Sequence, residues 1–261
     1  MKPLDTKSSL EDIMEEVLGT DPLEFKKITK SYALISTPRS GSSMFAEKLR
    51  STNLLGDPKE WLNLRYIRAY SAVTGIQKPS FGSYLKDIIC RTSSKNGVFG
   101  VNFHVDQFLS LQKRNIDIFR YLKFDQVYAI ERENKLAQAF SLAKARVTDI
   151  WSSKTPLKPG DQEKIDNISN SFVLNELKNL VGWSEIYDAK LARYVREKII
   201  YERVLEDTGG EVFYRIAAGM GQKLAENFEF TTELKAQSNS QDKERIKLIE
   251  SAIFGRKFDS H

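Results

Sequence analysis

A short run of small residues with one arginine is the part of the sequence best suited to hold an anion. It reads Thr37-Pro38-Arg39-Ser40-Gly41-Ser42-Ser43. The apolar residues 32–35 before it predict a strand, and residues 44–49 after it predict a helix. A strand that turns directly into a helix presents the free N–H groups of the first helical turn, and the helix dipole adds partial positive charge. With three serine hydroxyls and the guanidinium of Arg39, this loop predicts a phosphate site.

The loop departs from the nucleotide-triphosphate motif G-x-x-x-x-G-K-[ST] at two positions. No glycine opens it, and Ser42 follows Gly41 where that motif needs lysine. The loop therefore lacks the main sequence pattern that would indicate ATP or GTP hydrolysis.

A strand followed by T-P-R-S-G-S-S resembles the 5′-phosphosulfate loop of sulfotransferases, enzymes that use 3′-phosphoadenosine 5′-phosphosulfate (PAPS). Within that superfamily the sequence resembles the Stf0-type group, the bacterial trehalose 2-sulfotransferases, whose loop carries arginine as Arg39 does here. The resemblance implies that Thr37–Ser43 bind the nucleotide. It also implies that Arg39 is catalytic, because a fixed cation stabilises the charge that builds on the leaving group.

Arg132 and Ser141 form the second signal. Arg132 directly follows a predicted strand, and Ser141 lies in the helix predicted next, within the segment Arg132-Glu133-Asn134-Lys135-Leu136-Ala137-Gln138-Ala139-Phe140-Ser141. This segment resembles the Stf0 pattern of an arginine, a short gap and Q-A-x-S. The resemblance implies that both residues hold the 3′-phosphate of PAPS.

A third signal lies in Gly56-Asp57-Pro58-Lys59-Glu60-Trp61-Leu62. It resembles the Stf0 segment G-E-P-x-E-[aromatic], whose second carboxylate is the general base. The resemblance therefore assigns the base role to Glu60, and an acceptor hydroxyl needs such a group because it is a poor nucleophile until its proton is removed. Asp57 replaces the first glutamate of the pattern and, with Trp61, is expected to contact the acceptor. Trp61 and Trp151 are candidates for an apolar wall beside Glu60.

Asn102 and His104 lie on one face of the strand predicted over residues 98–103. The Stf0 group tends to carry lysine at the position of Asn102, so we expect a weaker site or an altered acceptor preference. Both residues are candidates for the acceptor pocket. Two later segments also resemble the family: Tyr201–Leu205 matches Y-E-x-L, with a structural role, and Lys235–Ser240 lies where a loop closes over the 3′-phosphate.

Apolar periodicity predicts the elements that hold these residues. We expect further strands at 127–130 and 199–201, helices at 10–18, 134–151, 171–196 with a break near Gly182, 211–226 and 242–254, and a loop at 156–166. Ser8 and Glu11 predict a capping box on the first helix. Strands that alternate with helices predict an α/β, three-layer, P-loop-like fold with a mainly parallel sheet flanked by helices. Ligands bind at the carboxyl ends of such strands, which brings Thr37–Ser43, Asn102–His104 and Glu131–Arg132 together.

Composition excludes several classes of function. The net charge of +5 in 261 residues is a mild excess without a dense basic block, so no nucleic-acid partner is expected. One cysteine, Cys90, and two histidines give no disulfide and no zinc cluster, and no metal is expected. The polar first residues do not predict a signal peptide, and no apolar run predicts a membrane span. The cytoplasm is therefore the expected location.

The sequence as a whole predicts a helical extension, 1–30, and one sulfotransferase-like domain, 31–261. The resemblance implies transfer of the sulfuryl group of PAPS to a carbohydrate or glycolipid hydroxyl, in a homodimer. Variable loops at 61–95 and 152–170 are expected to shape the acceptor pocket. Two alternatives remain open: a nucleotide kinase with a degenerate phosphate loop, and a non-catalytic nucleotide- or anion-binding protein.

Overall fold

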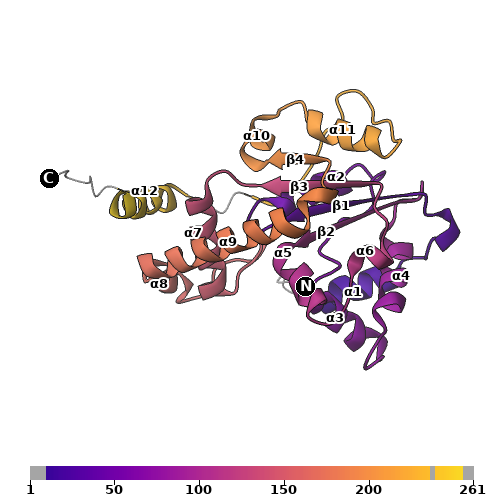
Figure 1. The fold of residues 1–261 in the computed structure, drawn as a ribbon, viewed down its shortest axis with the longest axis horizontal. Helices are drawn as coiled ribbons and strands as arrows, with labels where there is room; N and C mark the ends of the chain where they lie inside the picture. Colours follow the sequence, from indigo (N-terminus) through magenta and orange to yellow (C-terminus); the bar gives the residue numbers. More distant parts are fainter. Residues whose placement is uncertain (1–9, 236–238, 255–261) are drawn as a thin grey trace, which may run out of the picture.

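The computed structural model describes residues 10–235 and 239–254, and a parallel sheet forms its centre. The strands are β1 (Lys30–Ser36), β2 (Val98–His104), β3 (Gln126–Glu131) and β4 (Glu197–Ile200), in the order β2-β1-β3-β4. All neighbouring pairs are parallel. Helices cover both faces of the sheet (Figure 1), which confirms the predicted fold class.

The register of the strands fixes where the site lies. Ser36, the last residue of β1, is opposite His104 in β2 and Ile130 in β3. Glu131, the last residue of β3, is opposite Ile200 in β4. The loop after β1 and the ends of the other three strands therefore share one edge of the sheet, as the sequence predicts.

Alternate side chains of β1 enter two different cores, because successive residues of a strand point to opposite faces. Ala33 and Ile35 pack into the first core, and Tyr32 and Leu34 into the second. Helices α1 (Leu10–Gly19), α3 (Leu64–Thr74), α4 (Phe81–Thr92), α5 (Val105–Gln112) and α6 (Ile118–Tyr121) contribute to the first core. Helices α2 (Ser42–Arg50), α10 (Tyr201–Glu206) and α11 (Glu211–Gly219) contribute to the second.

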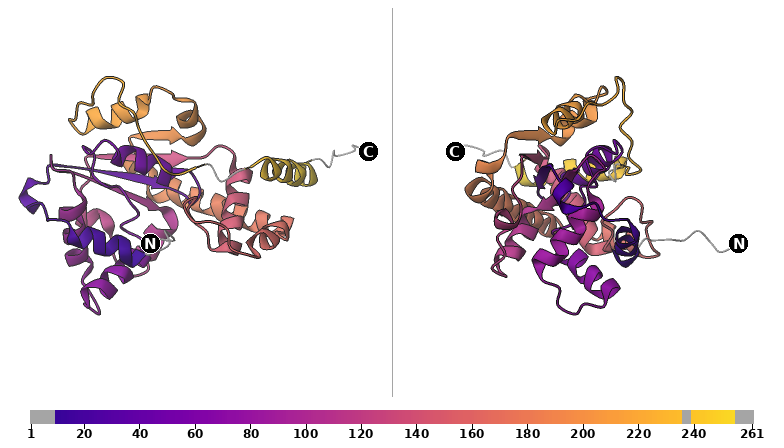
Figure 2. Two further views of the ribbon diagram at one scale, coloured as in Figure 1. Left: turned by 180° about the vertical axis from the view of Figure 1, so that it is seen from behind. Right: turned by 90° about the vertical axis from the view of Figure 1, so that its right-hand side faces the viewer.

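A third core lies beyond the end of the sheet. Helices α7 (Lys135–Thr148), α8 (Asp161–Asp166), α9 (Asn170–Lys190) and α12 (Ser240–Phe254) surround it, with Leu142, Val173, Leu180 and Ile249 inside. Figure 2 shows α12 at one end of the molecule, past α7. Two short 3₁₀ helices, Phe25–Lys27 and Ala192–Tyr194, complete the described elements.

Several predicted boundaries are wrong. Helix α9 runs through Gly182 without a break, because Val173, Leu180 and Tyr187 on both sides of the glycine are buried and packing outweighs its low helix propensity. The predicted loop at 156–166 contains α8, which starts after Gly160. Helix α11 ends at Gly219 rather than at Glu226. Tyr201 opens α10 instead of ending β4.

The N-terminal part packs onto the body of the molecule. Met14 and Val17 of α1 are buried in the first core, beside residues of α3 and α4. Ser8 of the predicted capping box lies outside the described residues, so the box stays a prediction, as does the domain boundary at residue 30. Among the described helices none has the length and apolar character needed to cross a bilayer.

Candidate active site

The loop between β1 and α2 has the backbone of an anion site. Arg39 has a φ of 65° and Gly41 a φ of 88°, both in the left-handed region. Gly41 precedes α2 and has no side chain to cap the first helical turn, so an anion has access to its N–H groups. A side chain at Gly41 is also excluded by packing, because a Cβ atom there would lie 2.1 Å from Cδ2 of Tyr201.

Two serines around the loop have buried hydroxyls that are not hydrogen bonded. Ser40 is fully buried, and no described residue pairs with its Oγ or with that of Ser36. A buried hydroxyl without a partner is costly, so such an atom favours a ligand. Gln138 of α7 fixes the loop from the other side: its Nε2 donates to Thr37 Oγ1 (2.8 Å) and to the Pro38 carbonyl (2.7 Å).

On one side of the loop, Glu60 lies in a hydrogen-bonded cluster that we call the Glu60 network, defined as Ser42, Glu60, Asn102, His104 and Gln107. Gln107 Nε2 donates to Glu60 Oε2 at 2.6 Å, and His104 Nε2 lies 3.8 Å from Glu60 Oε1. His104 Nε2 also lies 3.3 Å from Ser42 Oγ, in the first turn of α2. A single side chain, that of His104, therefore connects the predicted base Glu60 to Ser42 of the phosphate loop.

Asn102 and His104, the two residues predicted from β2, both face Ser42. Asn102 Nδ2 donates to Ser42 Oγ at 3.3 Å, while its Oδ1 is buried without a described partner. The backbone N–H of His104 donates to Gln107 Oε1 at 3.3 Å. Burial raises the pKa of the neighbouring Asp106 carboxyl, and the charge of His104 opposes this shift.

Arg39, which belongs to the loop, and Arg132, which follows β3, lie next to one another, and we call them the arginine pair. Arg39 Nε donates to Ser141 Oγ at 3.0 Å, and its Nη1 donates to the Trp151 carbonyl at 2.6 Å. Arg132 Nη1 lies 3.4 Å from the Arg39 carbonyl, and its buried Nε makes no hydrogen bond within the described structure. The structure thus brings Arg39, Arg132 and Ser141 together, as the two motifs predict.

The electrostatics of the arginine pair favour a bound anion. Burial and the charge of Arg132 together lower the pKa of Arg39 to about 10, although Tyr201 and Glu60 oppose the shift. Burial also lowers the pKa of Arg132, although Tyr201 and Glu202 oppose the shift. Two buried like charges destabilise one another, and an anion between them would remove that cost.

The segment Tyr201–Leu205 contacts the arginine pair directly. The Tyr201 ring stacks under Arg132, with 5.4 Å from the guanidinium carbon to the ring centroid. Glu202 Oε1 lies 3.9 Å from Arg132 Nε. Both Glu202 oxygens also accept backbone hydrogen bonds, from Glu133 (3.0 Å) and Asn134 (3.2 Å), at the start of α7.

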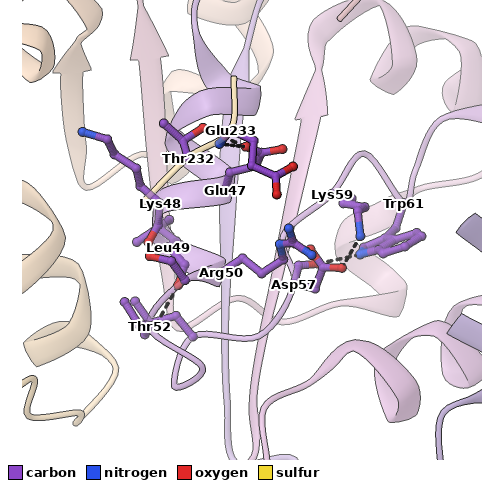
Figure 3. A network of polar contacts seen from close by, with 12 residues as sticks. Glu47, Lys48, Leu49, Arg50, Thr52, Asp57, Lys59, Trp61, Thr232 and Glu233 are labelled. Atoms are coloured by element: carbon purple, nitrogen blue, oxygen red, sulfur yellow. Dashed lines mark hydrogen bonds and ion pairs between the residues drawn. The ribbon is translucent and has the colours of Figure 1, made fainter. Parts of the chain in front are cut away.

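Asp57 and Trp61, which the sequence predicts in the acceptor pocket, make contacts within the protein, and their predicted role stays a prediction. Figure 3 shows Asp57 between Lys59 and Arg50. Arg50 is the last residue of α2, whereas the phosphate loop precedes the first turn of that helix. Trp61 is fully buried in the first core, where it packs on Tyr66 and donates from Nε1 to the Asp57 carbonyl (2.7 Å). Because its ring is fully buried, the Trp61 side chain has no exposed surface and packs in the core, and the residue that it follows in the chain is Glu60.

A cavity of about 620 Å³ opens next to Ser141. Its basic lining residues are Lys144, Lys235 and Arg245, and Asn239 also contributes. Lys235 and Asn239 come from the segment expected to close over a 3′-phosphate. Ala236, Gln237 and Ser238 of that segment lie outside the described residues. No group of three or more metal-ligating side chains occurs in the described ranges.

The comparison with family models decides the family of the chain. The model of the Stf0 sulphotransferase family matches residues 31–248. The chain belongs to this family. The resemblance stated from the three motifs is thereby confirmed, although their individual residue roles stay predictions.

Solved structures similar to this Stf0 chain are distant. A sulfotransferase from Alicyclobacillus acidocaldarius has 12% identity and a TM-score of 0.45, with 88% of this chain and 97% of that chain covered. The sulfotransferase domain of the Synechococcus PCC 7002 olefin synthase has 11% identity and a TM-score of 0.42, with 90% and 96% covered. The comparison with curated proteins gives no match.

Sequence reasoning missed two residues of this Stf0 site. Gln107 follows His104 by three positions, the spacing of a capping box, but histidine is not a usual first residue of that motif. Gln138 stands in the Q-A-x-S pattern and had no assigned role. Its contact with the loop spans 101 positions in sequence, so local patterns do not reveal it.

Proposed function

We propose that this member of the Stf0 family transfers the sulfuryl group of PAPS to a hydroxyl of a carbohydrate or glycolipid acceptor, with Glu60 as general base and without a metal. The observation that carries the proposal is the position of Glu60. It contacts the phosphate loop through His104 and Ser42, while Arg39 lies in that loop and Arg132 contacts the loop backbone at the Arg39 carbonyl. The acceptor class follows from the resemblance to the trehalose 2-sulfotransferases.

The residues present fit such a donor. Ser40 Oγ and Arg132 Nε are buried polar atoms that make no hydrogen bond with the described residues, and both lie where the motifs assign a phosphate group. The cavity beside Ser141 has a volume typical of small-molecule sites. Lys144, Lys235 and Arg245 line it together with Asp166 and Asp242, of which Asp242 is paired with Lys144. Because the basic side chains outnumber the acidic ones, we assign the cavity to the 3′-phosphate end of the nucleotide rather than to the acceptor.

The chain supplies alignment and charge in this reaction. PAPS, when bound, supplies the sulfuryl group and the phosphate that leaves. Glu60 takes the proton of the acceptor hydroxyl as the new S–O bond forms. Arg39 and the first-turn N–H groups of α2 stabilise the negative charge on the phosphate oxygens as the old S–O bond breaks. Gln107 keeps one Glu60 oxygen fixed, so that the other faces His104 and the loop.

Calorimetric binding without magnesium tests the proposal against its alternatives. We expect 3′-phosphoadenosine 5′-phosphate to bind at least about tenfold more tightly than ADP or AMP, the scale of one charge-assisted phosphate contact. Arg132→Ala should lose most of this preference. Arg196→Ala is the control, because Arg196 bonds Gln126 at the opposite end of the sheet. Equal binding of ADP would overturn the sulfotransferase proposal and favour a kinase or an anion-binding protein.

A further inference from the structure

A carboxylate in the middle of α2 joins three separate segments of the chain. Glu47 Oε2 accepts from Thr232 Oγ1 at 2.7 Å and from the Glu233 N–H at 3.2 Å. Glu47 Oε1 lies 2.9 Å from Lys154 Nζ. Figure 3 shows Thr232 and Glu233 directly over Glu47 on α2. We call residues 231–235 the strap and residues 152–155 the α7 loop.

The strap and the α7 loop are also joined to each other. Lys154 Nζ lies 2.7 Å from Glu233 Oε2, and the Lys235 N–H donates to Ser153 Oγ at 2.9 Å. Thr231 N–H reaches Ser51 Oγ, just past the end of α2, at 3.3 Å. The strap is therefore held at both of its ends, and Glu47 occupies the centre of these contacts.

Both segments end in the wall of the cavity beside Ser141. The α7 loop contributes Ser153 and Thr155 to the lining, and the strap contributes Lys235. Helix α2, which carries Glu47, begins at the phosphate loop. One side chain thus connects the element that faces the 5′ end of the nucleotide to the wall assigned to its 3′ end.

We propose that Glu47 is a positioning residue that sets the cavity wall, and with it Lys235, at the correct distance from Ser141 for the 3′-phosphate. This inference rests on the proposed function. Partial burial opposes ionisation of Glu47, but the bonds from Thr232 and Lys154 outweigh it and lower its pKa. Burial likewise opposes the charge on Lys154, and its bonds to Glu233 and Glu47 outweigh that effect and raise its pKa. Glu47 is therefore a charged anchor at neutral pH.

Nucleotide binding measured by calorimetry tests the proposal without a known acceptor. The probes are 3′-phosphoadenosine 5′-phosphate and ADP, and the variants are Glu47→Ala and Glu47→Gln. We expect Glu47→Ala to weaken the first probe by about fivefold to tenfold, the scale of one or two lost hydrogen bonds to a charged group, and to change ADP binding less than about twofold. Glu47→Gln keeps an acceptor oxygen for the strap, so it should fold well and give an intermediate effect.

Two further variants separate positioning from general stability. Glu197→Gln removes a partly buried glutamate from an ion pair with Arg215, away from the cavity, and should leave both affinities unchanged. Lys154→Met should weaken the 3′-phosphate probe as well, and less so when Glu47 is already alanine, because both changes release the same wall.

The possible outcomes distinguish a failure of the positioning role from a failure of the proposed function. If wild type prefers the 3′-phosphate and Glu47→Ala keeps that preference, the positioning role is wrong and the proposed function stands. Equal weakening of both probes would also reject it, because Glu47 would then only stabilise the fold. If wild type shows no preference for the 3′-phosphate, the proposed function and this inference both fail.

Discussion

The Glu60 network and the arginine pair, the two groups of polar residues at the phosphate loop, differ in how their side chains are paired. In the Glu60 network the polar groups bond to one another: Gln107 holds Glu60, and Ser42 lies within reach of both His104 and Asn102. In the arginine pair, burial and mutual repulsion lower the pKa of Arg39 to about 10, and Arg132 Nε has no hydrogen bond within the described residues.

We infer from this difference that the two groups have separate roles, one in proton transfer and one in phosphate binding. The Glu60 network is organised in advance, which suits a group that must meet a proton at a fixed position. Tyr201 and Glu202 offset part of the cost of the buried arginine pair, and an anion would offset more of it, which suits a group that must capture a phosphate. We therefore expect changes in the Glu60 network to affect turnover, changes at Arg132 to affect nucleotide affinity, and changes at Arg39 to affect both.

Glu60→Gln should give the largest effect and the sharpest separation of the two regions. The amide cannot accept the acceptor proton, so turnover should fall about 10²-fold to 10⁴-fold, the usual contribution of general base catalysis. Nucleotide affinity should stay within about twofold, because Glu60 is hydrogen bonded to Gln107 and Asn63, although its charge also acts on Arg39. Steady-state kinetics with an accepted sugar and calorimetry on the same preparation measure both. Unchanged turnover would remove the base assignment.

Gln107→Leu should have a smaller effect of the same kind. The change removes the 2.6 Å bond to Glu60 Oε2, and Asn63 Nδ2 at 3.3 Å is then the donor that remains on that oxygen. We expect turnover to fall about tenfold with little change in KM for PAPS, the scale of one hydrogen bond to a charged group. Gln112→Leu, on the same helix and distant from Glu60, serves as the control. A rise in KM for PAPS without a fall in kcat would contradict the comparison.

The smallest effect concerns stability on the arginine side. Burial alone would raise the pKa of Glu202, but hydrogen bonds from Glu133 and Asn134 and the charge of Arg132 lower it below its ordinary value of 4.5. The stabilisation from Glu202 is thus present above pH 4.5 and is lost as the pH falls below it. Thermal unfolding at pH 6 and pH 3.5 should show a larger loss for wild type than for Glu202→Gln. Equal losses would show that Glu202 does not support Arg132 through its charge.

The sequence by itself determined the elements whose signal is local. The turn at Thr37–Ser43 follows from its residue types, and the short apolar runs of β1, β2 and β3 predict strands that are buried on both faces. The parallel order of the strands then places the loop, His104 and Arg132 at one edge. The α/β fold, and the place of these residues at one edge of the sheet, could therefore be predicted from the sequence.

Only the tertiary structure decided which side chains meet across that edge. Asp57 and Glu60 are three residues apart, yet Asp57 pairs with Lys59 and Arg50, whereas Glu60 accepts a hydrogen bond from Gln107 of α5. Glu47 meets Thr232 across 185 positions, and no periodicity encodes such a contact. Local patterns fix the backbone, whereas partners distant in sequence are set by how the helices pack on the sheet.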